Sequence, residues 1–311
     1  MLKLPFHSIT NFTCLEDFFL ISYIFIDDLY QAYVPDHIRY RKNYQKALLS
    51  DSEVITLSLC GELLGIDSEK AWHSFVRKNY FYLFPKLCSL SRFHRLRRSL
   101  LDVTELIREK ILQPFLEKEW IGIVDSFPLP VCHFGRAAFC RSFRQEGATY
   151  GRCASKKETY FGYKVHAITT LQGLITHFEI TPACVDDREA LRDLTTQMQH
   201  GLLLADKGYV SDSLFCDLQK QGIRLLALKR SNSKCPFSKE WKQWIASRRR
   251  RIETTFSQLK GQLNIERVLT KSFRGLCTRL VSKMFAHNLC YVLQANLGKT
   301  NEFGKIKHLI F

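Results

Sequence analysis

The sequence predicts an α+β protein, in which an all-helical N-terminal domain precedes a mixed β-sheet with helices packed on it. Three observations predict this class. Apolar residues recur at helical spacing through the first third of the chain, strand-length apolar runs begin near residue 119, and the later runs alternate with helical segments. With 311 residues, of which 46% are hydrophobic, the chain can bury a sizeable core.

The N-terminal domain is predicted to span residues 1–118. Residues 15–34 are rich in apolar residues at helical spacing, and residues 99–118 are periodic with charges on the opposite face. Ser50 and Glu53 form a capping box, which predicts that another helix begins there.

The sheet domain is predicted to span residues 119–297, with a basic tail at 298–311. Its predicted elements are, in order, strands 120–124, 161–170 and 174–181, helix 186–199, strand 202–205, helix 211–221, strand 223–228, a long helix through 248–262 and a helix at 278–297. Leu171-Gln-Gly173 predicts a hairpin turn. Three strands that can pair as a meander, followed by alternating α and β elements, match the ribonuclease H-like fold.

The charge of the chain is strongly basic, with 46 Lys plus Arg against 30 Asp plus Glu and a net charge of +16. This balance indicates a polyanionic partner, usually nucleic acid, although a basic protein kept soluble by its charge is the alternative. The eleven cysteines are odd in number and contain no CxxC pair, which favours reduced thiols. The apolar run at 18–26 is shorter than the roughly 20 residues that span a bilayer, so we expect a soluble, cytoplasmic protein.

Residues 86–98 carry five Lys or Arg residues and no acid. A solvated helix face would account for them, but DNA-backbone contacts need Lys and Arg and little else, and we favour that role. The arginines predicted to make these contacts are Arg92, Arg95, Arg97 and Arg98.

Two carboxylates directly follow predicted strands, Asp125 after Ile-Gly-Ile-Val and Asp206 after Leu-Leu-Leu-Ala. A strand end holds a side chain rigidly at the rim of a sheet. Either acid alone would more often be a turn or cap residue, but two at equivalent positions indicate a shared site.

A third acid lies on the predicted helix that contains Arg248-Arg-Arg-Arg251. Ile252, Phe256, Leu259 and Leu263 fall on one apolar face. Beside that face, Arg249, Glu253 and Lys260 form a stripe at i, i+4 and i+11. An ordinary Arg–Glu helix pair is the alternative, but four consecutive arginines favour a polyanionic partner.

Three carboxylates that converge from two strands and a helix suit phosphodiester chemistry. Mg²⁺ prefers oxygen ligands and is commonly held by carboxylates together with substrate oxygens. Two divalent ions about 4 Å apart can neutralise the phosphate, activate the attacking oxygen and stabilise the leaving oxygen. We therefore predict that Asp125, Asp206 and Glu253 are catalytic metal ligands for Mg²⁺ or Mn²⁺, with two ions bound.

Four segments together resemble bacterial insertion-sequence transposases of the DDE type, and most closely the group named after insertion sequence 982. They are Asp125-Ser-Phe-Pro-Leu-Pro130, Ala154-Ser-Lys-Lys-Glu-Thr-Tyr-Phe-Gly-Tyr-Lys-Val-His166, Leu204-Ala-Asp-Lys-Gly-Tyr209 and Arg251-Ile-Glu-Thr-Thr-Phe256. The likeness covers nearly the whole chain. The wider family pattern is Tyr, two residues, Arg, three residues, Glu, six residues, Lys; Arg249, Glu253 and Lys260 match it, whereas Ala246 stands at the Tyr position.

The resemblance implies a metal-binding triad of Asp125, Asp206 and Glu253, with Arg249 and Lys260 contacting DNA near the cut. It also implies strand cleavage followed by transfer of the freed 3′ hydroxyl to target DNA, by a homodimer that associates with the bacterial nucleoid. A metal-dependent endonuclease without strand transfer and a catalytically inactive, transposase-derived DNA-binding protein are the alternatives.

Other residues near the predicted strands have more open roles. Lys207 follows Asp206 and is predicted to approach a phosphate, whereas Lys156, Lys157 and Lys164 face either phosphate or solvent. Three further expectations concern neighbouring residues: Asp186 and Asp187 begin a helix, His166 is a satisfied buried side chain, and Tyr160, Phe161 and Tyr163 either stack on bases or pack in the core.

Overall fold

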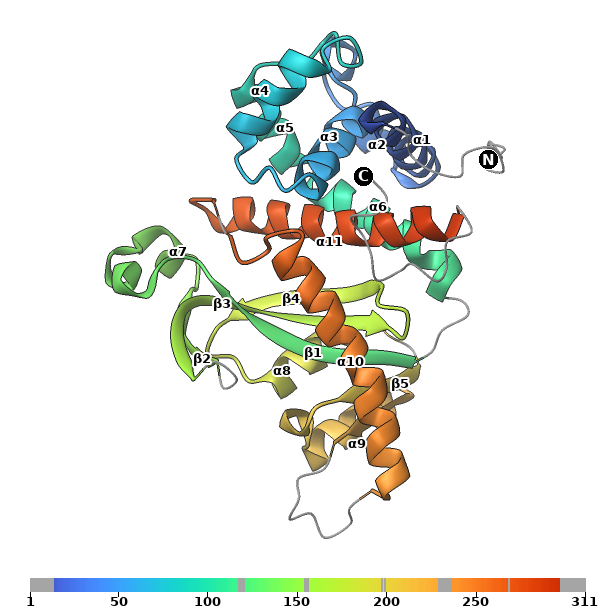
Figure 1. Ribbon diagram of the computed structural model, residues 1–311, viewed down its shortest axis with the longest axis vertical. Coiled ribbons are helices and arrows are strands. Elements are labelled where there is room, and N and C mark those ends of the chain that lie inside the picture. Colours follow the sequence, from blue (N-terminus) through green and yellow to red (C-terminus); the bar gives the residue numbers. More distant parts are fainter. Residues whose placement is uncertain are drawn as a thin grey trace. The chain divides into compact units, whose positions relative to one another are not determined.

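The computed structural model describes residues 14–116, 121–153, 157–196, 198, 200–228, 237–267 and 269–296. Its contacts divide the chain into two compact units (Figure 1). The helical unit comprises the described parts of residues 1–113 and 259–311, and the sheet unit those of residues 114–258. This division differs from the predicted domains, because the last long helix, predicted within 119–297, belongs with the N-terminal helices.

The helical unit is built around α3 (Asp51–Leu63), of which every residue except Glu53 is buried. The capping box is confirmed, because Glu53 N donates to Ser50 Oγ (3.1 Å) and Ser50 N donates to Glu53 Oε2 (2.6 Å). Helices α1, α5 and α11 pack against α3. The helices of this unit are α1 (Leu15–Tyr33), α2 (Asp36–Arg39), η2 (Tyr44–Lys46), α3, α4 (Glu69–Asn79), α5 (Leu90–Ser99), α6 (Leu101–Leu116) and α11 (Phe273–Asn296).

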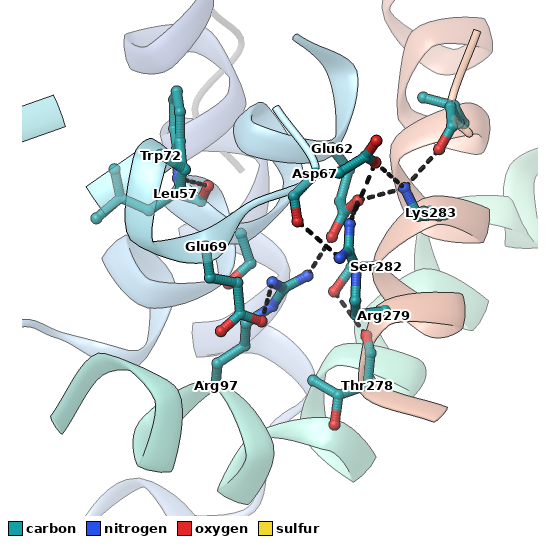
Figure 2. Close-up of polar contacts among 12 residues, drawn as sticks. Leu57, Glu62, Asp67, Glu69, Trp72, Arg97, Thr278, Arg279, Ser282 and Lys283 are labelled. Carbon is teal, nitrogen blue, oxygen red and sulfur yellow. Dashed lines mark hydrogen bonds and ion pairs between the residues drawn. The ribbon is translucent and has the colours of Figure 1, made fainter. Parts of the chain in front are cut away.

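A network of buried charges joins the N-terminal helices to α11 (Figure 2). Glu62, at the end of α3, accepts hydrogen bonds from Arg97 (2.6 Å), Arg279 (3.2 Å) and Lys283 (2.6 Å). Asp67 lies 3.4 Å from Arg279 and 3.5 Å from Lys283. Burial opposes ionisation of Glu62, but the three cations outweigh it and lower its pKa to about 2.

The sheet unit contains six strands, β1 (Ile121–Pro130), β2 (Thr149–Cys153), β3 (Glu158–Thr170), β4 (Ile175–Pro182), β5 (Gly201–Ala205) and β6 (Ile223–Ala227). Their order is β2-β3-β1-β5-β6, and β4 pairs with β3. β3 is antiparallel to β1, β2 and β4, whereas β1, β5 and β6 run parallel. This mixed sheet with flanking helices is compatible with the predicted ribonuclease H-like fold.

The predicted hairpin is confirmed, because β3 and β4 pair around the turn at residues 171–174. β2, η3 (Phe134–Phe139) and α7 (Arg141–Gln145) were not predicted. Gly162 lies where β3 passes from pairing with β2 to pairing with β4. A Cβ there would lie 2.3 Å from the Leu129 carbonyl oxygen, and φ is +154°, so only glycine fits this crossing.

Three further helices belong wholly or largely to the sheet unit: α8 (Asp187–Leu194), α9 (Asp212–Lys220) and most of α10 (Lys239–Gly261). Short 3₁₀-helix η4 (Lys207–Tyr209) follows β5. The apolar face predicted for α10 is confirmed at Ile252, Phe256 and Leu259, which are buried; Leu263 is also buried but follows the end of the helix. No described helix is both long and apolar enough to cross a membrane.

Candidate active site

Asp125 and Asp206 lie at equivalent positions on neighbouring parallel strands. The last paired residues of β1 and β5 are Ile123 and Leu204, and each aspartate comes two residues later. Asp125 was expected just after a strand, but β1 continues to Pro130 because it still pairs with β3. The two carboxylates therefore lie where β1 and β5 separate, at the carboxyl ends of their parallel pairing.

Arg249 joins the two aspartates through one guanidinium group. Arg249 Nη2 donates to Asp125 Oδ2 (3.2 Å), and Arg249 Nη1 donates to Asp206 Oδ1 (3.3 Å). The Arg249 side chain is only 10% exposed. A shared, largely buried cation requires both carboxylates to face the same point, so they form a single site.

Helix α10 runs across the sheet (Figure 1), and three contacts made by residues that follow Arg249 hold it there. Arg251 Nε donates to the Gln172 carbonyl (2.6 Å), and Thr255 Oγ1 donates to the Gly173 carbonyl (3.2 Å). Phe256 packs edge-on against Phe127 of β1, with ring centroids 4.7 Å apart. The arginine run thus divides its roles between the carboxylates and the β3–β4 turn.

The Asp125 carboxyl group is held in place by its neighbour, because Ser126 N donates to Asp125 Oδ1 (2.8 Å). Burial raises the pKa of Asp125 to about 6, and the negative charges of Asp206 and Asp187 add to this rise. The Ser126 hydrogen bond and Arg249 act in the opposite direction without cancelling it. Burial is therefore the main reason why Asp125 resists ionisation, and the neighbouring carboxylates add to it.

Asp187 belongs to the same surroundings, which sequence reasoning missed. Asp186 is the N-cap of α8 and accepts from Arg188 N (2.9 Å), as predicted for a helix start. Asp187 Oδ1 instead accepts from Lys164 Nζ (2.8 Å) and Ser126 Oγ (3.3 Å). Ser126 therefore connects Asp187 through its side chain with Asp125 through its backbone.

Two buried side chains adjoin this network. His166 is buried as expected, but it is only partly satisfied: its Nε2 pairs with Thr181 Oγ1 (2.9 Å), whereas its Nδ1 has no hydrogen-bond partner among the described residues. Burial lowers the pKa of His166 to about 4. Burial and the charges of Asp187 and Asp125 raise the pKa of Tyr209 well above its ordinary value. Both groups are uncharged near neutral pH, so Lys164 and Arg249 supply the positive charge here.

Glu253 does not join the two aspartates in this structure. It is exposed on α10, one turn after Arg249. Among the described residues, no group of three or more His, Cys, Asp or Glu side chains is arranged to hold a metal ion. Two of the three predicted ligands, Asp125 and Asp206, come together around a shared cation, which fits the binding of a divalent ion by these two carboxylates. Glu253 does not lie with them.

The predicted DNA-binding cations of the sheet unit differ in accessibility. Lys207, next to Asp206, and Lys157 are exposed, whereas Lys156 lies outside the described residues. Lys164 is occupied, because it donates to both Asp187 and the Val185 carbonyl (2.9 Å). Lys164 was predicted to face either phosphate or solvent, and an ion pair with Asp187 was not expected.

The remaining predicted cations belong to the helical unit. Lys260 pairs with Glu266 at 2.9 Å. Arg92, Arg95 and Arg98 are exposed on α5, but Arg97 is buried on the face that also contains Phe93 and Leu96. Because Arg97 binds Glu62 and Glu69 there, the structure corrects its prediction as a DNA contact.

The comparison with protein families identifies the chain by its sheet unit. A family model described as Transposase DDE domain matches residues 116–273, which is just over half of the chain. The chain therefore belongs to the DDE transposase family. No curated protein and no solved structure matches it.

Family membership gives the site its general chemistry. It supports a transposase-type function on DNA and implies dependence on divalent metal ions. The matched region contains Asp125, Asp206, Arg249 and Glu253, as well as Asp187. The predicted family of the chain is thus confirmed at the level of the DDE domain.

Proposed function

We propose that this protein is an insertion-sequence transposase, related to the insertion sequence 982 group, that cuts DNA at the element ends and joins the freed 3′ hydroxyl to target DNA. Asp125, Asp206 and Glu253 would hold Mg²⁺ or Mn²⁺ ions, two of them in the complete site. The observation that carries this proposal is the pair of aspartates just beyond the end of the β1–β5 pairing, which share the single cation of Arg249.

Bound divalent ions would neutralise the phosphate and stabilise the attacking and leaving oxygens. Neighbouring residues orient the carboxylates that would bind these ions. Ser126 N fixes one oxygen of Asp125, so that the other faces Arg249. Glu253 lies on the same helix as Arg249. For Glu253 to reach the two aspartates, the proposal requires a change in the Glu253 side-chain conformation or in the local position of α10.

Asp187 is proposed as a positioning residue for Asp125. It is held by Lys164 and contacts Ser126, the residue whose backbone N–H fixes Asp125. Partners that orient metal ligands in this indirect way typically change metal affinity or activity by about 10- to 100-fold when they are removed. Lys207 is exposed next to Asp206 and is proposed to contact a phosphate near the cut, alongside Arg249 and Lys260.

The test is strand cleavage and joining on labelled DNA that contains the flanks of the gene, in which the element ends lie. Wild-type protein is compared with Asp206→Asn and with Asp212→Asn, a matched change at the exposed start of α9. Each reaction is run with Mg²⁺, with Mn²⁺ and with EDTA. Joined product that needs the metal and disappears only in Asp206→Asn is the expected result.

Other outcomes identify the alternative functions. Metal-dependent cleavage without joining would indicate a nuclease. DNA binding without cleavage by either wild type or variant would indicate a DNA-binding protein that has lost catalysis. The proposed homodimer, in which two copies bring two element ends together, predicts that the joining complex sediments with two protein chains.

A further inference from the structure

The connection between β1 and β2, residues 131–148, has exposed aromatic side chains next to arginines. Phe139 is 82% exposed, more than any other large hydrophobic side chain in the described chain, and Phe134 is 51% exposed. Tyr150, at the start of β2, is 48% exposed and packs edge-on against Phe134, with centroids 6.0 Å apart. Single exposed apolar residues are common, but two within one short connection and a third that packs against one of them need a reason.

The charges of this segment have one dominant sign. Between residues 131 and 153 there are four arginines and a single acid, Glu146. All four arginines are exposed: Arg136, Arg141, Arg144 and Arg152. We call these arginines together with Phe134, Phe139 and Tyr150 the aromatic–arginine surface.

Contacts with β3 and within the segment fix the backbone of residues 131–148, which carries these side chains. Phe143 is buried and packs against Tyr163 of β3, with ring centroids 6.3 Å apart. Tyr163 Oη donates to the Glu146 carbonyl (3.0 Å). Arg144 Nη2 donates to the Ala137 carbonyl (3.1 Å), which ties α7 to η3. The backbone that carries the exposed aromatics is therefore already ordered before a ligand binds, which reduces the entropy lost on binding.

We infer that the aromatic–arginine surface binds unpaired bases of DNA, with the rings stacking on the bases and the arginines contacting the phosphates. A purely apolar partner would leave four arginines without counter-charges, whereas a nucleic-acid strand satisfies both kinds of side chain. Aromatic stacking on bases tolerates any sequence, and arginines track the backbone. Tyr160, Phe161 and Tyr163, expected from sequence either to stack on bases or to pack in the core, are buried in the core. Base stacking is therefore left to Phe134, Phe139 and Tyr150.

This inference rests on the proposed action on DNA. It concerns how a DNA strand is bound outside the site formed by Asp125 and Asp206. β1 carries Asp125 and leads directly into this segment, so the surface and the aspartate are parts of one chain stretch. DNA that is opened or distorted near a cut exposes bases, and a surface for such bases would favour the opened state. Phe residues are also the kind of side chain that wedges between base steps.

The experiment measures binding of full-length protein to fluorescent DNA by anisotropy, in EDTA so that no cleavage occurs. The probes are an oligothymidylate of about 20 nucleotides and a fully paired duplex of similar length, since site sizes on stacking surfaces reach about 16 nucleotides. The variants are Phe139→Ala, Arg141→Gln and, as a matched exposed aromatic in the helical unit, Phe81→Ala (48% exposed).

We expect Phe139→Ala to weaken binding of the single strand by roughly 5- to 150-fold, the range that corresponds to one lost base stack. Its effect on the duplex should be much smaller. Arg141→Gln should weaken both probes and lower the salt dependence by about one phosphate contact. Phe81→Ala should change neither affinity.

Equal affinity of wild type and Phe139→Ala for the single strand would overturn the inference while wild-type cleavage and joining still support the proposed function. If wild type binds neither probe, both ideas fail together. A variant that binds DNA normally but loses self-association in sedimentation would show that a second copy of the chain covers this surface, and would also overturn the inference. Unchanged circular dichroism of Phe139→Ala checks that the fold is retained.

Discussion

Replacing Glu62 by Gln tests whether the buried charge network holds the helical unit together. Glu62 is 4% exposed and is bonded to three cations that are themselves buried. Gln keeps the size of the side chain but removes its charge. Arg97, Arg279 and Lys283 would then share the remaining carboxylates Asp67 and Glu69.

The magnitude follows from two arguments. Removing one partner from a buried ion pair typically costs about 3–5 kcal/mol, because the opposite charge stays buried without compensation. Independently, lowering the pKa of Glu62 from 4.5 to about 2 corresponds to about 3 kcal/mol in favour of the ionised folded state. We therefore expect Glu62→Gln to lower the free energy of unfolding of the helical unit by about 3 kcal/mol.

The assay is urea unfolding followed by circular dichroism, combined with hydrogen exchange measured on peptides. Exchange should speed up in α3 and α11, whereas peptides of β1 and β3 should change little. Glu189→Gln is the control, because the Glu189 side chain is 66% exposed in its pair with Arg192 and should lose less than about 1 kcal/mol.

The pH dependence gives a second check on the same network. Because folding lowers the pKa of Glu62, its stabilising contribution is complete above pH 4.5 and is lost as the pH falls towards about 2. Glu62→Gln should flatten this part of the stability profile. A loss below about 1 kcal/mol, equal to that of the exposed control pair, would refute the reasoning that this network stabilises the unit.

Three further changes test the sheet unit. Because burial raises the pKa of Asp125 to about 6, the contribution of the protonated Asp125 carboxyl group to stability is present below pH 3.8 and is lost as the pH rises through about 6. Asp125→Asn should therefore stabilise the metal-free protein at pH 8 by about 1–3 kcal/mol in thermal unfolding. A loss of stability would contradict this expectation. Gly162→Ala should destabilise by about 2–4 kcal/mol, because its Cβ would meet the Leu129 carbonyl, and a change below about 1 kcal/mol in urea unfolding would show that the strands can shift. Asp187→Asn should lower strand cleavage by about 10- to 100-fold with Asp193→Asn, on the exposed side of α8, as control; equal rates would exclude a positioning role.

Local patterns in the sequence determined the elements whose formation depends on nearby residues. The capping box of Ser50 and Glu53 specified the start of α3, and the apolar spacing of Ile252 and Phe256 specified the buried face of α10. Turn residues between two β-rich runs specified the β3–β4 hairpin. These signals are readable because helix periodicity, caps and turns act over a few residues.

Two of the predicted site residues, Asp125 and Asp206, also followed from local pattern, because each comes at the end of an apolar run. Their grouping was a correct inference from equivalent positions. The length of β1 was not predictable in this way, since Pro128 and Pro130 argue against a strand centre. They are accommodated because β1 pairs with β3 there after its pairing with β5 has ended.

Only the tertiary structure decided which charged side chains meet. Arg249 and Asp125 are 124 residues apart in sequence, and Glu62 and Arg279 are 217 residues apart. Arg97 looks like its exposed neighbours in the sequence, yet its place on α5 buries it against Glu62. Asp187 resembles a second cap residue, yet the fold brings it to Ser126. The physical reason is that a charge takes its role from its partner and its burial, and both are fixed by contacts between distant segments rather than by local spacing.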